Sequence, residues 1–208
     1  MRALHTTLAA LFVLAPALAQ EPDPSQWPAR DAHEGLTVSC DPYPDAERSK
    51  AKFGKKHPAA VGILPIEVAF RNDTDFPMLV DLDSVRLLLQ PPGSEKQQLD
   101  WMTVEDVLEM ILYKQGPSLN RPRTPLPLPR SKGNRSKEYL ELESRIRPMA
   151  LEMTLIPPKK TVRGFLFFRM GRQMEQVENA KLYIPDVKFM HNKQPLFFFE
   201  VDLSKAVK

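Results

Sequence analysis

The fold of this chain follows from the stretch Ile66-Glu67-Val68-Ala69-Phe70, in which large apolar residues stand at every second position. A period of two is typical of a β-strand that buries one face. The polar cluster at 71–75 comes directly after it and predicts a turn, which Phe76-Pro77 closes. We therefore expect a strand at 66–70, after which the chain reverses its direction.

Strand signals continue on both sides of this stretch. Apolar or alternating runs occur at 36–40, 78–82, 85–89, 151–155, 161–168, 181–189 and 195–203. Short strands separated by turn residues at a spacing of roughly ten are typical of an antiparallel sandwich. In the last run, Phe197, Phe199 and Val201 are expected to face one side of the strand and the residues between them the other.

The region at about 91–149, between these two groups of strands, differs in character. Thr103 precedes apolar residues at helical spacing, and Asp106 follows it by three positions as in a capping box, which predicts a helix over 104–113. A second helix is expected over 136–144. Prolines between these two segments favour extended backbone. We therefore predict one domain over 36–208, interrupted by a helical, proline-rich insertion.

Two segments resemble a known architecture. The residues from Gly62 to Thr74 (GILPIEVAFRNDT) resemble the second strand and turn of immunoglobulin-like extracytoplasmic domains. The residues from Ile156 to Phe168 (IPPKKTVRGFLFF) are similar to the strand, turn and strand near the end of such domains. The resemblance implies a mainly β fold, an immunoglobulin-like antiparallel β-sandwich, and no particular function. The chain lacks the cysteine pair and central Trp of antibody domains, since Trp101 lies in the insertion.

The first nineteen residues match a cleavable secretory signal. Arg2 supplies the positive charge, Leu4 to Leu14 is mostly apolar, and Ala17-Leu18-Ala19 has small residues at the cleavage positions. We expect a secreted or periplasmic protein, cleaved near Ala19-Gln20. Residues 20–35 show no apolar period and are expected to form a flexible leader. No later segment has the ~20 apolar residues that a membrane span needs.

Basic and acidic residues are nearly balanced over the whole chain, but basic residues are concentrated in the insertion. The chain has 29 basic and 26 acidic residues, which argues against nucleic-acid binding. Within the insertion, however, no acidic residue lies between Glu109 and Glu138, and the segment carries the basic residues Lys114, Arg121, Arg123, Arg130, Lys132, Arg135 and Lys137. Such a segment attracts anions. We expect it to contact an anionic envelope component or an acidic protein; a loop kept soluble by its charge is the alternative.

Cys40 is the only cysteine, so the chain forms no intramolecular disulfide. Its place at the end of the apolar run 36–40 predicts a buried, free thiol. Because an exported protein meets an oxidising environment, an intermolecular disulfide is the alternative.

No catalytic or metal-binding motif emerges. The histidines His33, His57 and His191 are far apart, without partners at zinc-ligand spacing. Soft-metal candidates are Met149 with Met153, Met170 with Met174, and Met190 beside His191, although methionine is also a common core residue. No nucleophile and base stand in a known motif. We expect no catalytic residue, metal or cofactor, and interpret the chain as a non-catalytic binding or structural protein of the cell envelope. An exported hydrolase or copper carrier with scattered site residues is the alternative.

Overall fold

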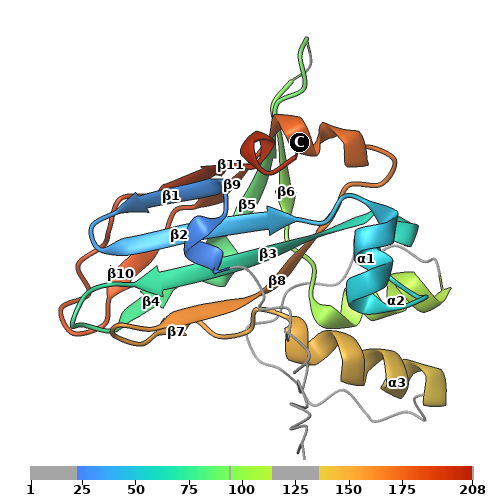
Figure 1. Ribbon diagram of the computed structural model, residues 1–208, viewed down its shortest axis with the longest axis horizontal. Helices are drawn as coiled ribbons and strands as arrows, with labels where there is room; N and C mark the ends of the chain where they lie inside the picture. The colour runs from blue at the N-terminus through green and yellow to red at the C-terminus, as the bar shows by residue number, and fades with distance from the viewer. Residues whose placement is uncertain (1–22, 94, 114–135, 208) are drawn as a thin grey trace, which may run out of the picture.

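The structure is a computed structural model, and it describes residues 23–93, 95–113 and 136–207 (Figure 1). Within these ranges the fold is mixed α/β, with three antiparallel sheets and a few helices. The first sheet has the order β1 (Ala29–His33), β2 (Leu36–Pro42), β3 (Ile63–Asn72) and β8 (Thr161–Arg169). The second has the order β10 (Val187–Phe189), β4 (Met78–Val80) and β7 (Leu155–Ile156). The third has the order β11 (Phe199–Asp202), β9 (Ala180–Ile184), β5 (Arg86–Leu89) and β6 (Gln97–Asp100).

β3 lies between β2 and β8 in the first sheet, and both of its faces are buried, whereas its alternation predicted one buried face. Ile66 pairs with Pro42 of β2 and Leu166 of β8, and Phe70 pairs with Val38 and Val162. The even-numbered apolar residues of β3 enter a core that they share with side chains from the other two sheets. The first sheet therefore packs one face against the second and third sheets, which lie behind it in Figure 1.

The other face of the first sheet is covered by helices, which makes the fold less purely β than the sequence suggested. The helices are α1 (Ala46–Phe53), α2 (Val104–Tyr113) and α3 (Lys137–Ile146). A second core lies between them and the sheet, and it contains Phe53, Phe165 and Phe167. An alternation of period two does not report which element covers the second face of a strand, so the helices over 104–113 and 136–144 were predicted without the face that they cover.

Both α2 and α3 begin at a hydroxyl residue that caps the helix, and the cap at Thr103 was predicted from the sequence. The Thr103 hydroxyl accepts a hydrogen bond from the Asp106 backbone N–H (3.2 Å) and donates one to the Asp106 carboxylate (2.8 Å). Ser136 caps α3 by accepting from the Tyr139 N–H at 3.2 Å. The helix predicted over 104–113 is confirmed, and the second helix begins and ends one or two residues later than predicted.

Two predicted boundaries are wrong. Residues 29–33 belong to the expected flexible leader, yet they form β1 and pair with β2 from Ala29–Cys40 to His33–Leu36. Residues 97–100 fall in the expected insertion, yet they form β6 and extend the third sheet beside β5. Both are exposed edge strands. Because β1 buries only Ala29 fully, and β6 buries no residue fully, neither shows the apolar alternation that marks a strand.

The open edge of β8 is closed by two segments that are not strands. The Leu151 N–H donates to the Phe165 carbonyl (2.9 Å), and the Met102 N–H donates to the Phe167 carbonyl (2.7 Å). Gly164 allows the first contact, because a Cβ atom at this position would lie 2.8 Å from the backbone N and Cα of Leu151. The Phe165 and Phe167 carbonyls at this edge therefore already have hydrogen-bond partners and are not free to pair with another strand.

Gly164→Ala should lower the free energy of unfolding by about 1–3 kcal/mol, since the added methyl group forces two backbone segments apart. Denaturant unfolding followed by circular dichroism measures the change. Thr161→Ala, at an exposed position of the same strand, is the control and should change stability by less than about 0.5 kcal/mol. Equal stability of the two variants would show that the segment at 150–151 does not approach β8 this closely.

β1 and β11 come together through side chains rather than through a backbone ladder. The Asp31 carboxylate accepts from the Glu200 N–H at 3.0 Å, and the Glu34 carboxylate accepts from the Phe197 N–H at 2.7 Å. Between them the His33 ring stacks on the Phe199 ring at 3.9 Å. These contacts join the first sheet to the third along a seam.

Candidate functional site

The basic insertion lies largely outside the described residues. Those outside are Lys114, Arg121, Arg123, Arg130, Lys132 and Arg135. Lys137 is described: it is exposed in the first turn of α3, where its ammonium lies 3.8 Å from the Glu141 carboxylate one turn later. The insertion as a contact surface therefore stays a prediction.

Cys40 lies on β2 and points into the core between the sheets, with no exposed surface. Burial, and secondarily the neighbouring Asp41 carboxylate, raise the pKa of its thiol far above the usual value. A thiol in this state is a poor nucleophile and has no route to a second chain.

The candidate metal ligands are dispersed. Met170 is buried in the core between the sheets, Met174 packs against that core, and Met149 packs against the helical core. His57 is buried, and burial together with Lys50 lowers its pKa. Within the described ranges, no three side chains of His, Cys, Asp or Glu are grouped so as to hold a metal ion.

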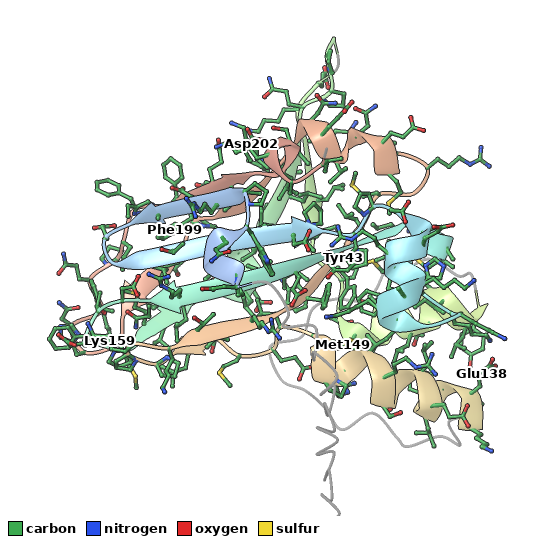
Figure 2. The ribbon with its side chains drawn as sticks, viewed as in Figure 1. Tyr43, Glu138, Met149, Lys159, Phe199 and Asp202 are labelled. Carbon is green, nitrogen blue, oxygen red and sulfur yellow. The ribbon has the colours of Figure 1, made fainter. Side chains whose placement is uncertain are left out.

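A polar cluster lies where α1 meets the first sheet. The Tyr43 hydroxyl donates to the buried carboxylate of Glu67 (3.2 Å), and the Arg48 guanidinium lies over the Tyr43 ring at 4.2 Å. Arg48 also forms an ion pair with Asp41 (2.8 Å). Burial, followed by the charges of Glu67 and Asp41, raises the pKa of Tyr43. These groups satisfy one another and fix α1 on the sheet, which is a structural role (Figure 2 labels Tyr43 at this junction).

A groove of about 440 Å³ lies on the outer face of the third sheet, between Leu88 and the loop that ends at Gly93. Three of its charged side chains, Lys181, Glu200 and Asp202, are engaged with neighbours. Lys181 forms an ion pair with Glu200 (2.6 Å), and hydrogen bonds from Ser204 hold the pKa of Asp202 below its usual value. The groove is open and polar, and it presents no activated nucleophile.

The most unusual surface is one end of the sheets, at the left of Figure 1. We call it the loop end; it comprises the turn 33–35, the loop 72–77, the turn 157–160 and the segment 189–197. Three large apolar side chains on it are at least half exposed: Phe76 (50%), Met190 (51%) and Phe197 (75%). We call these three the apolar tip residues. Large apolar side chains that are exposed together at one end of a molecule indicate a candidate interaction surface.

Backbone contacts connect the segments of the loop end. The Asp73 N–H donates to the Gly35 carbonyl (2.8 Å), and the Met190 N–H donates to the Pro77 carbonyl (2.9 Å). The Phe76 ring stacks on the His191 ring at 4.4 Å. The Asn72 N–H donates to the Lys160 carbonyl (3.0 Å), so the four segments are parts of one ordered surface.

Asn72 fixes the loop that carries Phe76. Its side-chain N–H₂ donates to the carbonyls of Phe76 (2.8 Å) and Ile156 (3.3 Å). Its side-chain oxygen accepts from the backbone N–H and the hydroxyl of Thr74 (2.9 and 2.7 Å). Asn72 is fully buried, and these hydrogen bonds give both polar atoms of its side chain partners within the protein.

The loop end was not predicted from the sequence. Phe197 was expected to share one side of a strand with Phe199 and Val201; instead it precedes β11 and is exposed, whereas the other two are buried. The sequence did carry one signal, because three consecutive phenylalanines cannot all be buried by a strand with a single covered face. Phe198 is half exposed and packs against the Tyr183 ring at 5.5 Å, on the outer side of the third sheet.

Comparison with known proteins assigns no family. No family model matches the chain, and no curated protein matches it. A distant match among solved structures is a functionally unknown protein from Listeria monocytogenes EGD-e, with 12% identity and a TM-score of 0.35. The match covers 75% of this chain and 70% of that one. None of the helices in the described ranges is long and apolar enough to cross a membrane.

Proposed function

We propose that this protein is an exported, non-catalytic binding protein of the cell envelope, built on an immunoglobulin-like β-sandwich, whose contact surface is the loop end. The observation that carries the proposal is the exposure of the apolar tip residues on segments held together by hydrogen bonds. An ordered surface with exposed aromatic side chains gains free energy when a partner covers it, and little ordering entropy is lost.

Export is proposed from the first nineteen residues, which have the charge, apolar stretch and small cleavage residues of a secretory signal. A non-catalytic role is supported by the polar clusters of the described part. The Tyr43 hydroxyl donates a hydrogen bond to Glu67, and the Lys181 ammonium donates one to Glu200. Neither pair places a free base beside a nucleophile, which covalent or acid–base chemistry needs.

The test is retention on envelope fractions of the source organism. The double variant Phe76→Ser/Phe197→Ser should be retained roughly tenfold less than the unmodified protein, since two exposed aromatic anchors are lost. The control is Leu140→Ser, which removes a 50% exposed apolar side chain from α3, at the opposite end of the molecule. It should be retained like the unmodified protein.

A third variant examines the basic insertion, in which Arg121, Arg123 and Arg130 are replaced by Glu. If this variant alone loses retention, the contact surface is the insertion and the loop end is the wrong surface. If the unmodified protein is not retained at all, the proposed function is wrong. Circular dichroism of each variant establishes that it is folded.

A further inference from the structure

We propose that two copies of this chain associate through β7, pairing their segments 152–156 antiparallel about a two-fold axis at Thr154. The pairing joins their second sheets into one. We call this segment the β7 edge, since β7 is an outermost strand of the second sheet (Figure 1). It is a different surface from the loop end, and the inference does not rest on the proposed function.

The β7 edge presents backbone groups that face away from its own sheet. Leu79 lies opposite Leu155 in the ladder between β4 and β7, and the Val80 N–H donates to the Thr154 carbonyl at 2.8 Å. Because hydrogen-bonded and non-bonded pairs alternate along an antiparallel ladder, the N–H and C=O of Leu155 point away from β4. The chain enters β7 without a turn or bend, so Met153 presents its groups on the same side. Within the described ranges these outward groups have no hydrogen-bond partner.

The other sheet edges in the described part differ from β7. The edge of β8 is closed by the segments at 102 and 151, and β1 and β11 face each other along the seam. The edge of β10 is bound by the segment that follows it, since the Leu196 N–H donates to the Val187 carbonyl at 2.8 Å. β6 is exposed and polar, with two glutamines and an aspartate among its four residues. Polar side chains of this kind protect an edge from pairing.

Exposed apolar side chains accompany the open backbone of the β7 edge. Met153 is 56% exposed and Leu155 is 37% exposed. The two side chains lie on the same face, because residues two apart in an extended segment point the same way. An edge that combines open backbone groups with exposed apolar side chains is a template for another strand.

The flanking residues restrict the pairing to one register. On one side the Leu151 N–H is already bonded to the Phe165 carbonyl, and on the other side Pro157 has no N–H. When two copies pair about Thr154, Met153 of each copy lies opposite Leu155 of the other. Every outward N–H and C=O of these two residues then gains a partner. The neighbouring registers place Leu155 opposite Leu151, or Met153 opposite Pro157, and leave outward groups unpaired.

The same register makes the surface complementary to itself, which selects a second copy as the occupant. Leu79 and Leu155 of one copy continue across the axis into Met153 of the second copy, so an apolar row crosses the contact twice. No like charges face each other, since Glu152 of one copy lies opposite Ile156 of the other. A foreign strand would find only two residues to bond, which is a short contact for a peptide. Two-fold dimers with the same patch on both subunits are also the commonest oligomers.

Sedimentation equilibrium of the purified mature chain over a range of concentrations measures the association. We expect a reversible equilibrium between monomer and dimer. Met153→Lys/Leu155→Lys should raise the dimer dissociation constant roughly tenfold or more, because the lysines oppose one another across the axis. Leu140→Lys, which changes a 50% exposed apolar residue on α3, is the control and should leave the constant unchanged. Circular dichroism establishes that each variant is folded.

The register is read from a cysteine cross-link. Thr154 is exposed, and on the two-fold axis it faces Thr154 of the second copy as a non-hydrogen-bonded pair. The Cα atoms of such a pair are about 4.5 Å apart, within the range that a disulfide spans. Thr154→Cys should therefore form a covalent dimer in a glutathione redox buffer, whereas Gln98→Cys, on the exposed edge of β6, should not. The native Cys40 has no exposed surface and does not compete.

Several results would overturn the inference. A monomer at every concentration would do so, and loss of envelope retention in the lysine double variant would then show that the β7 edge pairs with a foreign strand. A dimer that the lysine double variant retains in full, or that Thr154→Cys does not cross-link, would place the contact elsewhere. Dissociation of the dimer by Phe76→Ser/Phe197→Ser alone would assign it to the loop end.

Discussion

Phe53→Ala is expected to lower the free energy of unfolding by about 3–5 kcal/mol, the range for removing a large aromatic side chain from a core. Phe53 ends α1 and has no exposed surface. Its ring contacts the rings of Phe165 and Phe167 on β8, with centroids 4.9 and 6.1 Å apart, both edge to face. The Arg145 guanidinium of α3 donates to the Phe53 carbonyl at 3.2 Å. Loss of this one ring therefore leaves a cavity where α1 and β8 meet, next to a contact with α3.

Guanidinium unfolding at equilibrium measures the change, and Phe53→Leu is the matched control. Leucine keeps most of the volume and should cost less than about 1.5 kcal/mol. Near-native stability of Phe53→Ala would mean that the helical layer is not firmly packed on the first sheet. In that case α1 would also exchange its amide hydrogens much faster than β3.

Asn72→Ala should destabilise the protein by about 3 kcal/mol, because several buried polar groups lose their partners at once. The Phe76 and Ile156 carbonyls and the Thr74 N–H would each be left without the Asn72 side chain. The loss falls on the loop that carries Phe76, so hydrogen exchange should accelerate there before it accelerates in the sheets.

Asn72→Asp distinguishes the hydrogen bonds that the Asn72 side chain donates from those that it accepts. The aspartate keeps the acceptor facing Thr74 but places an oxygen opposite two carbonyls, to which it cannot donate. We expect it to be at least as destabilising as the alanine variant at neutral pH. Stability close to that of the unmodified protein would show that the two donated bonds contribute little.

The strands that the sequence predicted well are those whose burial is one-sided or complete. The runs at 36–40, 66–70 and 161–168 lie within β2, β3 and β8, and 104–113 matches α2. In each, packing alone dictates the apolar spacing. The run at 181–189 is divided, because Pro185-Asp186 separates β9 from β10. Only Leu155 of the run 151–155 lies in a strand; Leu151 instead pairs with the edge of β8.

The candidate site was harder to predict for a physical reason. The three apolar tip residues are 114 and 7 positions apart along the chain, at 76, 190 and 197, and each alone is an ordinary loop residue. Only the turns that connect β1 to β2, β3 to β4, and β10 to the segment before β11 bring them to one end. The basic insertion was conspicuous because its residues are consecutive. A site formed by residues that are close in the sequence is therefore easier to predict than a site whose residues come together only through the fold.

Asn72 also matters for how the protein can be produced. Together with Asp73 and Thr74 it forms the acceptor sequence for N-linked glycosylation. In the folded chain the acceptor nitrogen is buried and donates to two carbonyls, at 2.8 and 3.3 Å. A sugar could be attached only before the loop closes, and it would then prevent closure. Secretion from a eukaryotic host should therefore yield glycosylated, misfolded chains, whereas a host without this modification preserves the native loop.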